Sequence, residues 1–430
     1  MAFEQPRTRR QAQRPPTSTR RRGLGLAGLF FLGSLASGCG TPTAPLRGPD
    51  QRIYPIAAWY YVKGYVPEPE SQARDVMTGD FSHLRSLGFN AIVADAIEDD
   101  RRGLLLDVAE SQSMQVILPH ARTMAFVRSG QFNRAVLSEP KSVVRENVDQ
   151  VGRHPALYMH YVYDAPSADV ADRLAEIVTL YRRLDPAHPV FVALNQEPAA
   201  LSRYLNLSVV LWDNFPLADD ARPGELMNRR YATPSTHAAA LTDIYAATPD
   251  RHHWAMVQAV AIPGRVRFPA PAEMSVIHLT ALGAGFVDGV VFYRYHTDES
   301  PDSGLAPANR AMAPERTAAV RQVTQRSATW GPMLTRTRPA TDPIRLKNNQ
   351  VHATVLSGPK RQFVLVYNPN VETFGHDTIY VPTTVQGRPV IRAVNVDEPK
   401  RYGIKGSPPE IPIELRLRPG EGRLFELFGP

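Results

Sequence analysis

From residue 53 onward, the chain alternates short apolar runs with longer stretches in which apolar residues recur every three or four positions. The short runs are typical of buried parallel strands, and the longer stretches of amphipathic helices that cover them. The runs are eight in number and span residues 54–61, 89–95, 114–120, 156–164, 189–195, 207–216, 253–260 and 288–296. Eight strand-and-helix units in this length predict an α/β fold, a (β/α)8 TIM barrel over residues 53–335.

The stretch after Ser167 shows the helical pattern most clearly. Val170, Leu174 and Ile177 fall on one face at helical spacing, and Asp185-Pro186 ends the pattern. Ser167 itself is a predicted N-cap, because its hydroxyl can accept a bond from a free backbone N–H of the first turn. We therefore expect one long amphipathic helix between the fourth and fifth strands.

The pattern changes at about residue 336, where apolar and polar residues begin to alternate without helical spacing. Alternating segments cover residues 351–355, 362–367, 378–381, 390–394 and 413–417. Turn-forming pairs such as Gly358-Pro359 separate them. This pattern predicts a small antiparallel β-sandwich over residues 336–430.

The charge of the chain is concentrated at its N-terminus. The formal net charge is +7, but residues 1–38 hold seven arginines against Glu4, so the remainder carries only about +1. A nearly neutral body offers no broad basic surface for a polyanion. We therefore expect no nucleic acid among its partners.

Residues 23–38 form an apolar segment behind an arginine-rich lead, too short to cross a membrane and typical of a secretory signal. The segment ends in Leu35-Ala36-Ser37-Gly38-Cys39, which resembles the lipobox of bacterial lipoproteins. That resemblance implies a signal peptide over 1–38, lipidation of Cys39, a flexible tether over 39–52 and a lipid-anchored position in the bacterial cell envelope. The alternative is a chance cysteine after an ordinary signal peptide. As Cys39 is the chain's single cysteine, no intrachain disulfide can form.

Candidate chemistry is sought at the strand ends, because reacting groups of a TIM barrel lie at the carboxyl ends of its strands. Aromatic residues stand beside polar ones there, and flat rings suit the C–H faces of sugars. We assign candidate catalytic roles to Asp95, Asp164 and Asp213. The candidate substrate-binding residues are Trp212, Tyr293, Tyr163, His120, Asn195, Gln258, Arg294 and His296.

Several of these segments resemble glycoside-hydrolase-like TIM barrels of bacterial secreted proteins, which often carry a C-terminal β-sandwich. The sequence HPAL at 154–157 leads to Asp164-Ala165-Pro166, similar to the family's Asp-Glu-Pro, and residues 212–216 are similar to its Asp-x-Tyr-Pro. Residues 257–260 and 281–293 resemble its seventh strand and the approach to its eighth. The resemblance implies an envelope protein that acts on or binds a polysaccharide or oligosaccharide, by O-glycosyl hydrolysis if active.

The chain departs from that family at two positions. Ala165 stands where the general acid/base glutamate is expected, and Gln258 where related retaining enzymes place a nucleophilic glutamate. Three interpretations of Asp164 stay open: an acid paired with Asp213 or Asp95, a sugar-binding or supporting carboxylate in a barrel that has lost hydrolysis, or a structural residue that caps the following helix or pairs with an arginine such as Arg294. The alternative function is therefore a glycan- or protein-binding pseudoenzyme.

Other chemistry finds no support in the sequence. It contains no Gly-rich phosphate loop, no G-x-S-x-G elbow and no Cys/His zinc spacing, so we predict no cofactor and no metal. The pair His252-His253 is expected just ahead of its strand. His120 and His296 have the alternative role of satisfied structural histidines.

Overall fold

The computed structural model describes residues 53–129, 139–217, 234–263, 266–296, 304–306, 314–405 and 409–430. The chain divides into two compact units, Met1–Thr41 and Pro42–Pro430, and every element below belongs to the second. The predicted signal peptide, Cys39 and the tether lie outside the described residues. Within the described part, no helix is both long and apolar enough to span a membrane.

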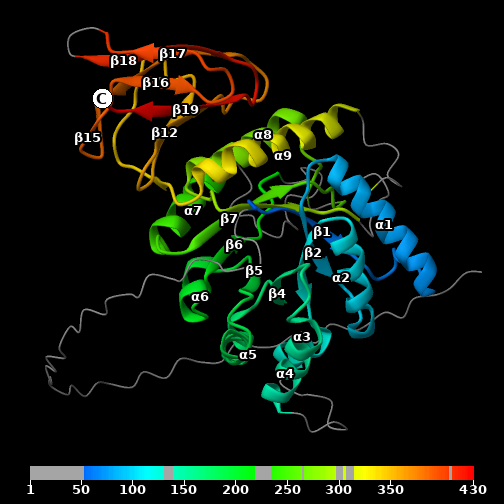
Figure 1. The fold of residues 1–430 in the computed structure, drawn as a ribbon. Helices are drawn as coiled ribbons and strands as arrows, with labels where there is room; N and C mark the ends of the chain where they lie inside the picture. The colour runs from blue at the N-terminus through cyan, green and yellow to red at the C-terminus, as the bar shows by residue number, and fades with distance from the viewer. Residues whose placement is uncertain are drawn as a thin grey trace, which may run out of the picture. The chain divides into compact units, whose positions relative to one another are not determined.

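Eight parallel strands close into a barrel in chain order, which confirms the predicted fold class (Figure 1). They are β1 (Ile56–Tyr61), β2 (Ala91–Asp95), β3 (Gln115–Pro119), β4 (Leu157–Asp164), β5 (Val190–Leu194), β6 (Val209–Trp212), β7 (His252–Gln258) and β8 (Gly289–Tyr293). Each lies within or almost within an apolar run of the sequence. Closure is completed by β1 against β8, with Ala57 opposite Val291.

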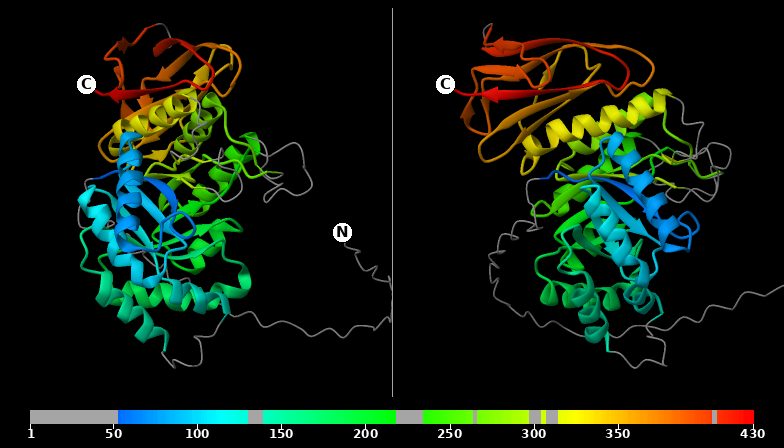
Figure 2. Two further views of the ribbon diagram at one scale, coloured as in Figure 1. Left: turned by 90° about the vertical axis from the view of Figure 1, so that its right-hand side faces the viewer. Right: turned by 45° about the vertical axis from the view of Figure 1, so that its right-hand side comes forward.

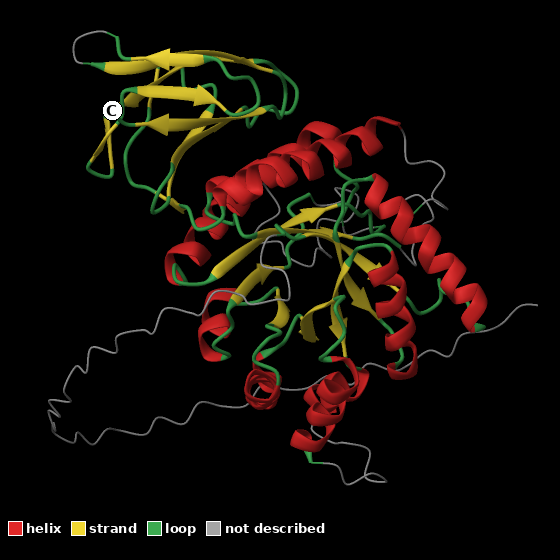
Figure 3. Cartoon of the chain, viewed as in Figure 1, coloured by secondary structure: helices red, strands yellow, loops and turns green. Residues whose placement is uncertain are grey.

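Helices surround the barrel, as Figure 3 shows. They are α1 (Glu70–Ser86), α2 (Arg102–Ser111), α3 (Ala121–Ser129), α4 (Pro140–Val151), α5 (Ala171–Leu184), α6 (Pro198–Tyr204), α7 (Pro234–Ala247), α8 (Pro271–Gly283) and α9 (Pro314–Leu334). Alternation along each strand sends one set of side chains inward and the other toward these helices. Trp59 and Val93 thus belong to the interior cluster, whereas Tyr60 and Ile92 pack outside.

Two local predictions differ from the structure. Ser167 precedes a 3-10 turn, η2 (Ala168–Val170), and makes no side-chain cap hydrogen bond, because its hydroxyl pairs with Asp169 instead. Helix α5 consequently begins at Ala171. The pair His252-His253 forms the first two residues of β7, because His252 pairs with Val209 in β6 and the His253 N–H is bound by Asp288 at 3.1 Å.

The C-terminal part is antiparallel, as predicted, and contains two main sheets. One has the order β17-β16-β19-β12-β11-β9 and the other β10-β13-β18, with a small β14-β15 hairpin beside them. Their bounds are β9 (Arg338–Pro339), β10 (Arg345–Leu346), β11 (His352–Ser357), β12 (Gln362–Tyr367), β13 (Gly375–Pro382), β14 (Thr384–Val385), β15 (Arg388–Pro389), β16 (Arg392–Asn395), β17 (Arg401–Gly403), β18 (Glu410–Leu417) and β19 (Gly422–Phe428).

The six-stranded sheet is buried on both faces. On one face Val364 and Phe425 pack with Ile413 of the smaller sheet. On the other, Phe363 and Leu365 join residues of α8 and α9 in a single apolar cluster. Figure 2 shows this sheet beside the two yellow and yellow-green helices. The contact explains why every residue of β12 is buried, although only the inner face of a free-standing sandwich would be.

Candidate functional site

Three carboxylic acids mark the carboxyl ends of even-numbered strands. Asp95 ends β2, Asp164 ends β4 and Asp213 directly follows β6. In a TIM barrel the inward side chains of alternate strands share a layer, and Tyr293 at the end of β8 supplies the fourth position. Strand β5 lies between the strands of Asp164 and Asp213 and fixes their level, since Ala165 N–H donates to Ala193 O at 2.9 Å and Asp213 N–H to Leu194 O at 2.8 Å.

The charges of the two other acids act on the ionisation of Asp164. Burial raises the pKa of Asp164 well above its usual range, and the charges of Asp213 and Asp95 raise it further. Asp164 itself is exposed to solvent in the barrel mouth, so the protein packed around the mouth and the two neighbouring acids act on a carboxyl group that a ligand can reach. Burial alone raises the pKa of Asp213 to about 7. Both groups are therefore harder to ionise than isolated aspartates.

Asp95 differs because it has hydrogen-bond donors. The Trp59 indole N–H donates to its Oδ2 at 2.9 Å, and the Ala96 N–H donates to its Oδ1 at 2.7 Å. Burial still raises the pKa of Asp95, while these two bonds and the charge of Arg294 act in the opposite direction. Asp95 is thus the member of the three that the protein prepares to hold a negative charge.

Aromatic rings form the floor beneath the acids. Trp59 meets Tyr161 at 5.5 Å between ring centroids and Tyr293 at 5.4 Å, both edge to face. The Tyr161 hydroxyl is buried and, among the described residues, has no hydrogen-bond partner. Burial raises its pKa, followed by the charges of Asp164 and Asp95. The Tyr161 hydroxyl therefore lies close enough to Asp164 and Asp95 to feel their charges, and it can donate a hydrogen bond that no described residue accepts.

Arg294 lies at the edge of this floor. Its guanidinium carbon is 4.8 Å from the ring centroid of Tyr61 and 5.5 Å from that of Tyr293, and the two tyrosine hydroxyls are 3.4 Å apart. Both rings remain partly exposed, unlike the arginine, which is 4% exposed. The half-buried tyrosines are the ring surfaces that a bound sugar can reach from the mouth.

The backbone is strained directly after two of the acids. Ala96 follows Asp95 with φ 51°, and Ala165 follows Asp164 with φ 46°. An alanine in the left-handed region is disfavoured by roughly 1–3 kcal/mol, and such strain clusters at functional sites. Both alanines turn the chain where it leaves a strand, so the same conformation sets the position of each carboxyl group.

A cavity of about 450 Å³ opens beside Asp95, between the segments that follow β1 and β2. Its wall includes Lys63, Tyr65, Ala96 and Asp100. Arg101 closes one side by donating to the carbonyl oxygen of Glu68 at 2.8 Å. Of the acidic segment 98–100, Glu98 and Asp100 line this hollow, whereas Asp99 pairs with His120.

Two of the predicted sugar-stacking rings lie outside the mouth. Trp212 is 2% exposed, points away from the barrel interior and stacks on His237 of α7 at 5.2 Å with 16° between planes. Tyr163 packs against the outer cluster around α5, because an irregularity at Tyr161/Tyr163 shifts the alternation of β4. The same irregularity lets Asp164 belong with the inward-facing residues. Neither ring offers a face toward the acids.

Several predicted polar residues already have structural partners. Gln258 is fully buried, accepts from Leu217 N–H at 3.1 Å and donates to the carbonyl oxygens of Leu217 and Arg267. Its amide thus holds the segments after β6 and β7 together. Asn195 continues the inward set of β5, and its Oδ1 is buried without a partner among the described residues. Of these two amides, Asn195 is the one with an atom left for a ligand.

The two predicted histidines lie at the periphery. His120 Nε2 is 3.3 Å from Asp99 Oδ2, and burial lowers its pKa. His296 Nδ1 is 3.0 Å from Tyr61 O, and its ring stacks on Tyr65 at 4.4 Å. Both histidines are buried beside their partners, which matches the structural alternative considered for them.

One cluster among the described residues has a metal-ligating composition, and it lies away from the mouth. His160, Asp185 and His188 bring their ligand atoms within 4.8 Å of one another. Both histidines are in hydrogen-bond contact with Asp185 Oδ2, at 2.8 and 2.9 Å, and these bonds hold its pKa below the usual range despite its burial. The contacts account for the cluster as a buried hydrogen-bonded link between β4 and the start of β5.

Comparison with known proteins identifies structures of the same fold but no relative by sequence. No family model matches the sequence, and no curated protein matches it. Among solved structures, the chain is similar to a glycoside hydrolase family 5 protein from Bacteroides vulgatus, with 11% identity, TM-score 0.59, and coverage of 88% of this chain and 90% of that one. A second structure described as a glycoside hydrolase has 9% identity, TM-score 0.60, and coverage of 88% and 93%.

A noncanonic maltogenic alpha-amylase from Thermotoga neapolitana aligns at 12% identity with TM-score 0.50, over 88% of this chain and 99% of that one. The structural neighbours are therefore family 5 and alpha-amylase-like TIM barrels, and this chain has a glycoside-hydrolase-like fold. At these identities the likeness concerns the fold, and the argument for chemistry depends on the residues of this chain.

Proposed function

We propose that this chain acts on a polysaccharide and hydrolyses O-glycosidic bonds at the mouth of its barrel. The observation that carries the proposal is the pairing of Asp164 and Asp213, two carboxyl groups whose pKa values are both raised and whose charges interact. Glycoside hydrolysis uses one carboxylic acid and one carboxylate. A pair in which one group keeps its proton while the other ionises supplies both.

The roles follow from the surroundings of the two groups. Asp164, whose pKa is raised by burial and by the charges of both other acids, is the acid that gives its proton to the glycosidic oxygen as the C–O bond breaks. Asp213 is the base that takes a proton from water while the water oxygen bonds to the anomeric carbon. The products are two shorter saccharides, one with a new reducing end, and Asp213 returns the proton to solvent as Asp164 regains one.

Asp95 supports this pair from the other side of the mouth. Its charge raises the pKa of Asp164, and its hydrogen bond from Trp59 keeps it in place. The proposal gives Tyr61 and Tyr293 the contact with the sugar ring and Asn195 a hydroxyl contact. Asp95 can also stabilise the positive charge that develops on the sugar in the transition state.

The second candidate function is glycan binding without hydrolysis, as part of an envelope or exopolysaccharide assembly. Ala165 favours it, because this position carries the glutamate of the Asp-Glu-Pro pattern that the sequence resembles. The engagement of Gln258 with backbone groups favours it too, since no anionic nucleophile is present at that strand end. In this case the three acids accept hydroxyl hydrogen bonds.

We further propose that the chain is exported and held in the bacterial cell envelope by a lipid on Cys39. The support is the sequence pattern around that residue. Expression in a bacterial host with a clickable palmitate analogue is expected to label the wild-type chain and not Cys39→Ala. Labelling of both, or of neither, would contradict the anchor.

A single assay separates the two functions. Purified chain beginning at Pro42, the start of the compact unit, is incubated with a panel of neutral and acidic polysaccharides, and reducing ends and retained glycan are measured together. New reducing ends support hydrolysis at Asp164 and Asp213. Retention without cleavage supports the binding function and overturns the proposed chemistry.

A further inference from the structure

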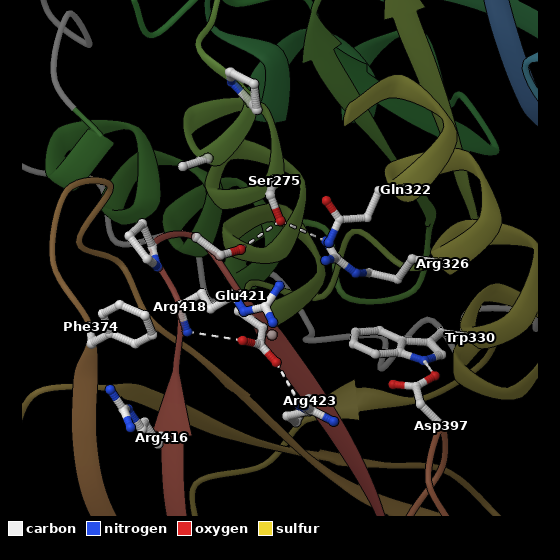
Figure 4. Close-up of a pocket in the computed structure, with 15 residues that line it drawn as sticks. Ser275, Gln322, Arg326, Trp330, Phe374, Asp397, Arg416, Arg418, Glu421 and Arg423 are labelled. Carbon is white, nitrogen blue, oxygen red and sulfur yellow. Dashed lines mark hydrogen bonds and ion pairs between the residues drawn. The ribbon is translucent and has the colours of Figure 1, made fainter. Parts of the chain in front are cut away.

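A cavity outside the barrel lies between two of its helices and the C-terminal sandwich. It has a volume of about 860 Å³ and is lined by α8, α9, β18, β19 and the turn between the last two (Figure 4). A hollow of this size holds an organic ligand rather than a single ion. Its wall is strongly polar and contains four arginines, Arg326, Arg416, Arg418 and Arg423.

Arg326 is the central group of this cavity. It extends from α9 and is only 9% exposed, yet Nη1 donates a single hydrogen bond, to Ser275 Oγ at 2.9 Å. Ser275 in turn donates to Gly420 O at 2.6 Å (Figure 4). The Arg326 guanidinium also lies over the Trp330 ring, 5.3 Å from the centroid, and among the described residues it makes no other hydrogen bond, although the group offers five N–H donors. Burial lowers its pKa to about 10, so it remains charged at neutral pH.

The two acids in the wall do not neutralise this charge. Asp397 Oδ1 accepts the Trp330 indole N–H at 2.9 Å. Glu421 Oε1 is 2.6 Å from Arg423 Nη2, and its Oε2 accepts the backbone N–H of Arg418 at 2.9 Å. Both carboxylates are therefore committed to neighbouring groups, although their charges reach Arg326.

A second cation faces the same hollow. The Arg418 side chain is exposed, and no ion pair or hydrogen bond of that side chain occurs among the described residues. Arg416 covers one face of Phe374 at 4.9 Å, and Phe374 is 50% exposed. The wall thus combines the guanidinium groups of the arginines with two carboxylates, the Gln322 amide and the accessible ring of Phe374.

The turn that carries Arg418 is held in place. Gly420 has φ +65°, and a Cβ built there would lie 2.4 Å from Ala272 O of α8. Only glycine fits this close approach. The arginine donors of the sandwich are consequently presented at a fixed position beside the first turns of α8.

From this geometry we infer that the cavity between α8, α9 and the sandwich binds a carboxylate-bearing oligosaccharide, with Arg326 and Arg418 holding the carboxylate. Guanidinium groups recognise carboxylates by paired N–H···O bonds, and the remaining polar wall serves hydroxyl groups. The site is separate from the barrel mouth. It would let the protein hold an acidic polysaccharide at a second point, whether or not the mouth cleaves it.

The test is calorimetric titration of the chain from Pro42 with trigalacturonic acid, and with its fully methyl-esterified form as the matched neutral ligand. The acid is expected to bind, with affinity falling as salt is added, and the ester to bind at least tenfold more weakly. Arg418→Ala is expected to lower affinity for the acid about tenfold. Arg183→Ala, an exposed arginine on α5, is the control and should leave affinity unchanged.

Further variants separate this site from the mouth. Arg326→Lys keeps the positive charge but removes the paired N–H donors of the guanidinium group. Affinity for the acid should therefore fall, while the far-UV circular dichroism spectrum stays that of the wild type. Asp164→Asn should leave binding of the acid intact. Equal affinity for acid and ester, unchanged affinity in Arg418→Ala, or loss of binding in Asp164→Asn would each overturn the inference. None of these results bears on whether the mouth releases reducing ends from longer polysaccharides.

Discussion

The indole nitrogen of Trp59 and the carboxylate of Asp95 are joined by a 2.9 Å hydrogen bond between adjacent strands β1 and β2. Trp59 is 1% exposed, so the bond lies in the barrel interior, where a lost donor is expensive. The bond connects the aromatic rings of the floor to one of the three acids at the barrel mouth. Because it lowers the pKa of Asp95, the packing of Trp59 affects how readily that acid ionises.

Trp59→Phe is expected to lower stability by roughly 1–3 kcal/mol, because the substitution removes indole volume and leaves Asp95 without a buried donor. The pKa of Asp95 should rise, since the indole bond lowers it. Thermal melting at several pH values, with NMR titration of the aspartate carboxyl carbons, measures both effects. Unchanged Asp95 titration in Trp59→Phe would contradict the role given to the bond.

Asp213→Asn is expected to stabilise the protein at pH 8 and to have little effect at pH 4. The folded pKa of Asp213 is about 7, against roughly 3.9 for an unfolded aspartate. The folded state therefore binds more protons between these values, and stability is lost as pH rises through that window. Asparagine removes the ionisation and should recover on the order of a few kcal/mol at pH 8. Equal melting shifts at both pH values would contradict the raised pKa.

If the mouth hydrolyses glycans, kcat/KM should increase with pH through about 7. Asp213 must be ionised to act as a base, and its pKa is about 7. The decrease at higher pH should reflect the pair losing its remaining proton, which belongs to Asp164 in the assignment above. Initial rates from pH 5 to 9 test this. A maximum near pH 4 would show that both groups ionise as ordinary aspartates.

Substitutions at Ala165 test whether the backbone directly after Asp164 is strained. At φ 46°, Ala165→Val should lower stability by about 1–2 kcal/mol more than Ala165→Gly, because a branched side chain tolerates the left-handed region least. Urea unfolding of both variants measures the difference. Equal stability of the two variants would mean that the turn relaxes without cost.

The apolar contact between the six-stranded sheet and helices α8 and α9, here called the junction, can be tested by substitution. Leu279 of α8 is fully buried in the cluster that joins the barrel helices to β12, so Leu279→Ala should cost about 2–5 kcal/mol. Leu201 of α6, which is only partly buried, is the matched control and should cost less. Melting curves compare the two. Similar destabilisation would show that the junction contributes no more than a peripheral contact.

The barrel could be predicted because each strand is a compact apolar run, and several runs end in a polar residue. The runs ending in Asp95 and Asp164 both match a strand of the structure to its last residue. Strict alternation along the first strand puts Trp59 on the same face as Ala57 and Tyr61, which is the inward face in the structure. Pattern alone also located the β12 strand over 362–367.

The site was harder to predict, because side-chain direction depends on three-dimensional register. Tyr163 and Trp212 were expected at the mouth, but the irregularity in β4 and the outward position on β6 place both rings elsewhere. Tyr161 was missed for the same reason. The pairing of Arg326 with Ser275 joins helices that the sequence separates by a strand, so no local pattern could indicate that cavity.

The proposed acid and base are best tested by counting the reducing ends that the wild-type chain, Asp164→Asn and Asp213→Asn release from one polysaccharide that the wild type retains. We expect new reducing ends from the wild type and none above background from either variant, while all three still bind the glycan. Cleavage at equal rates in all three, or retention by the wild type with no new reducing ends, would contradict the proposed acid and base.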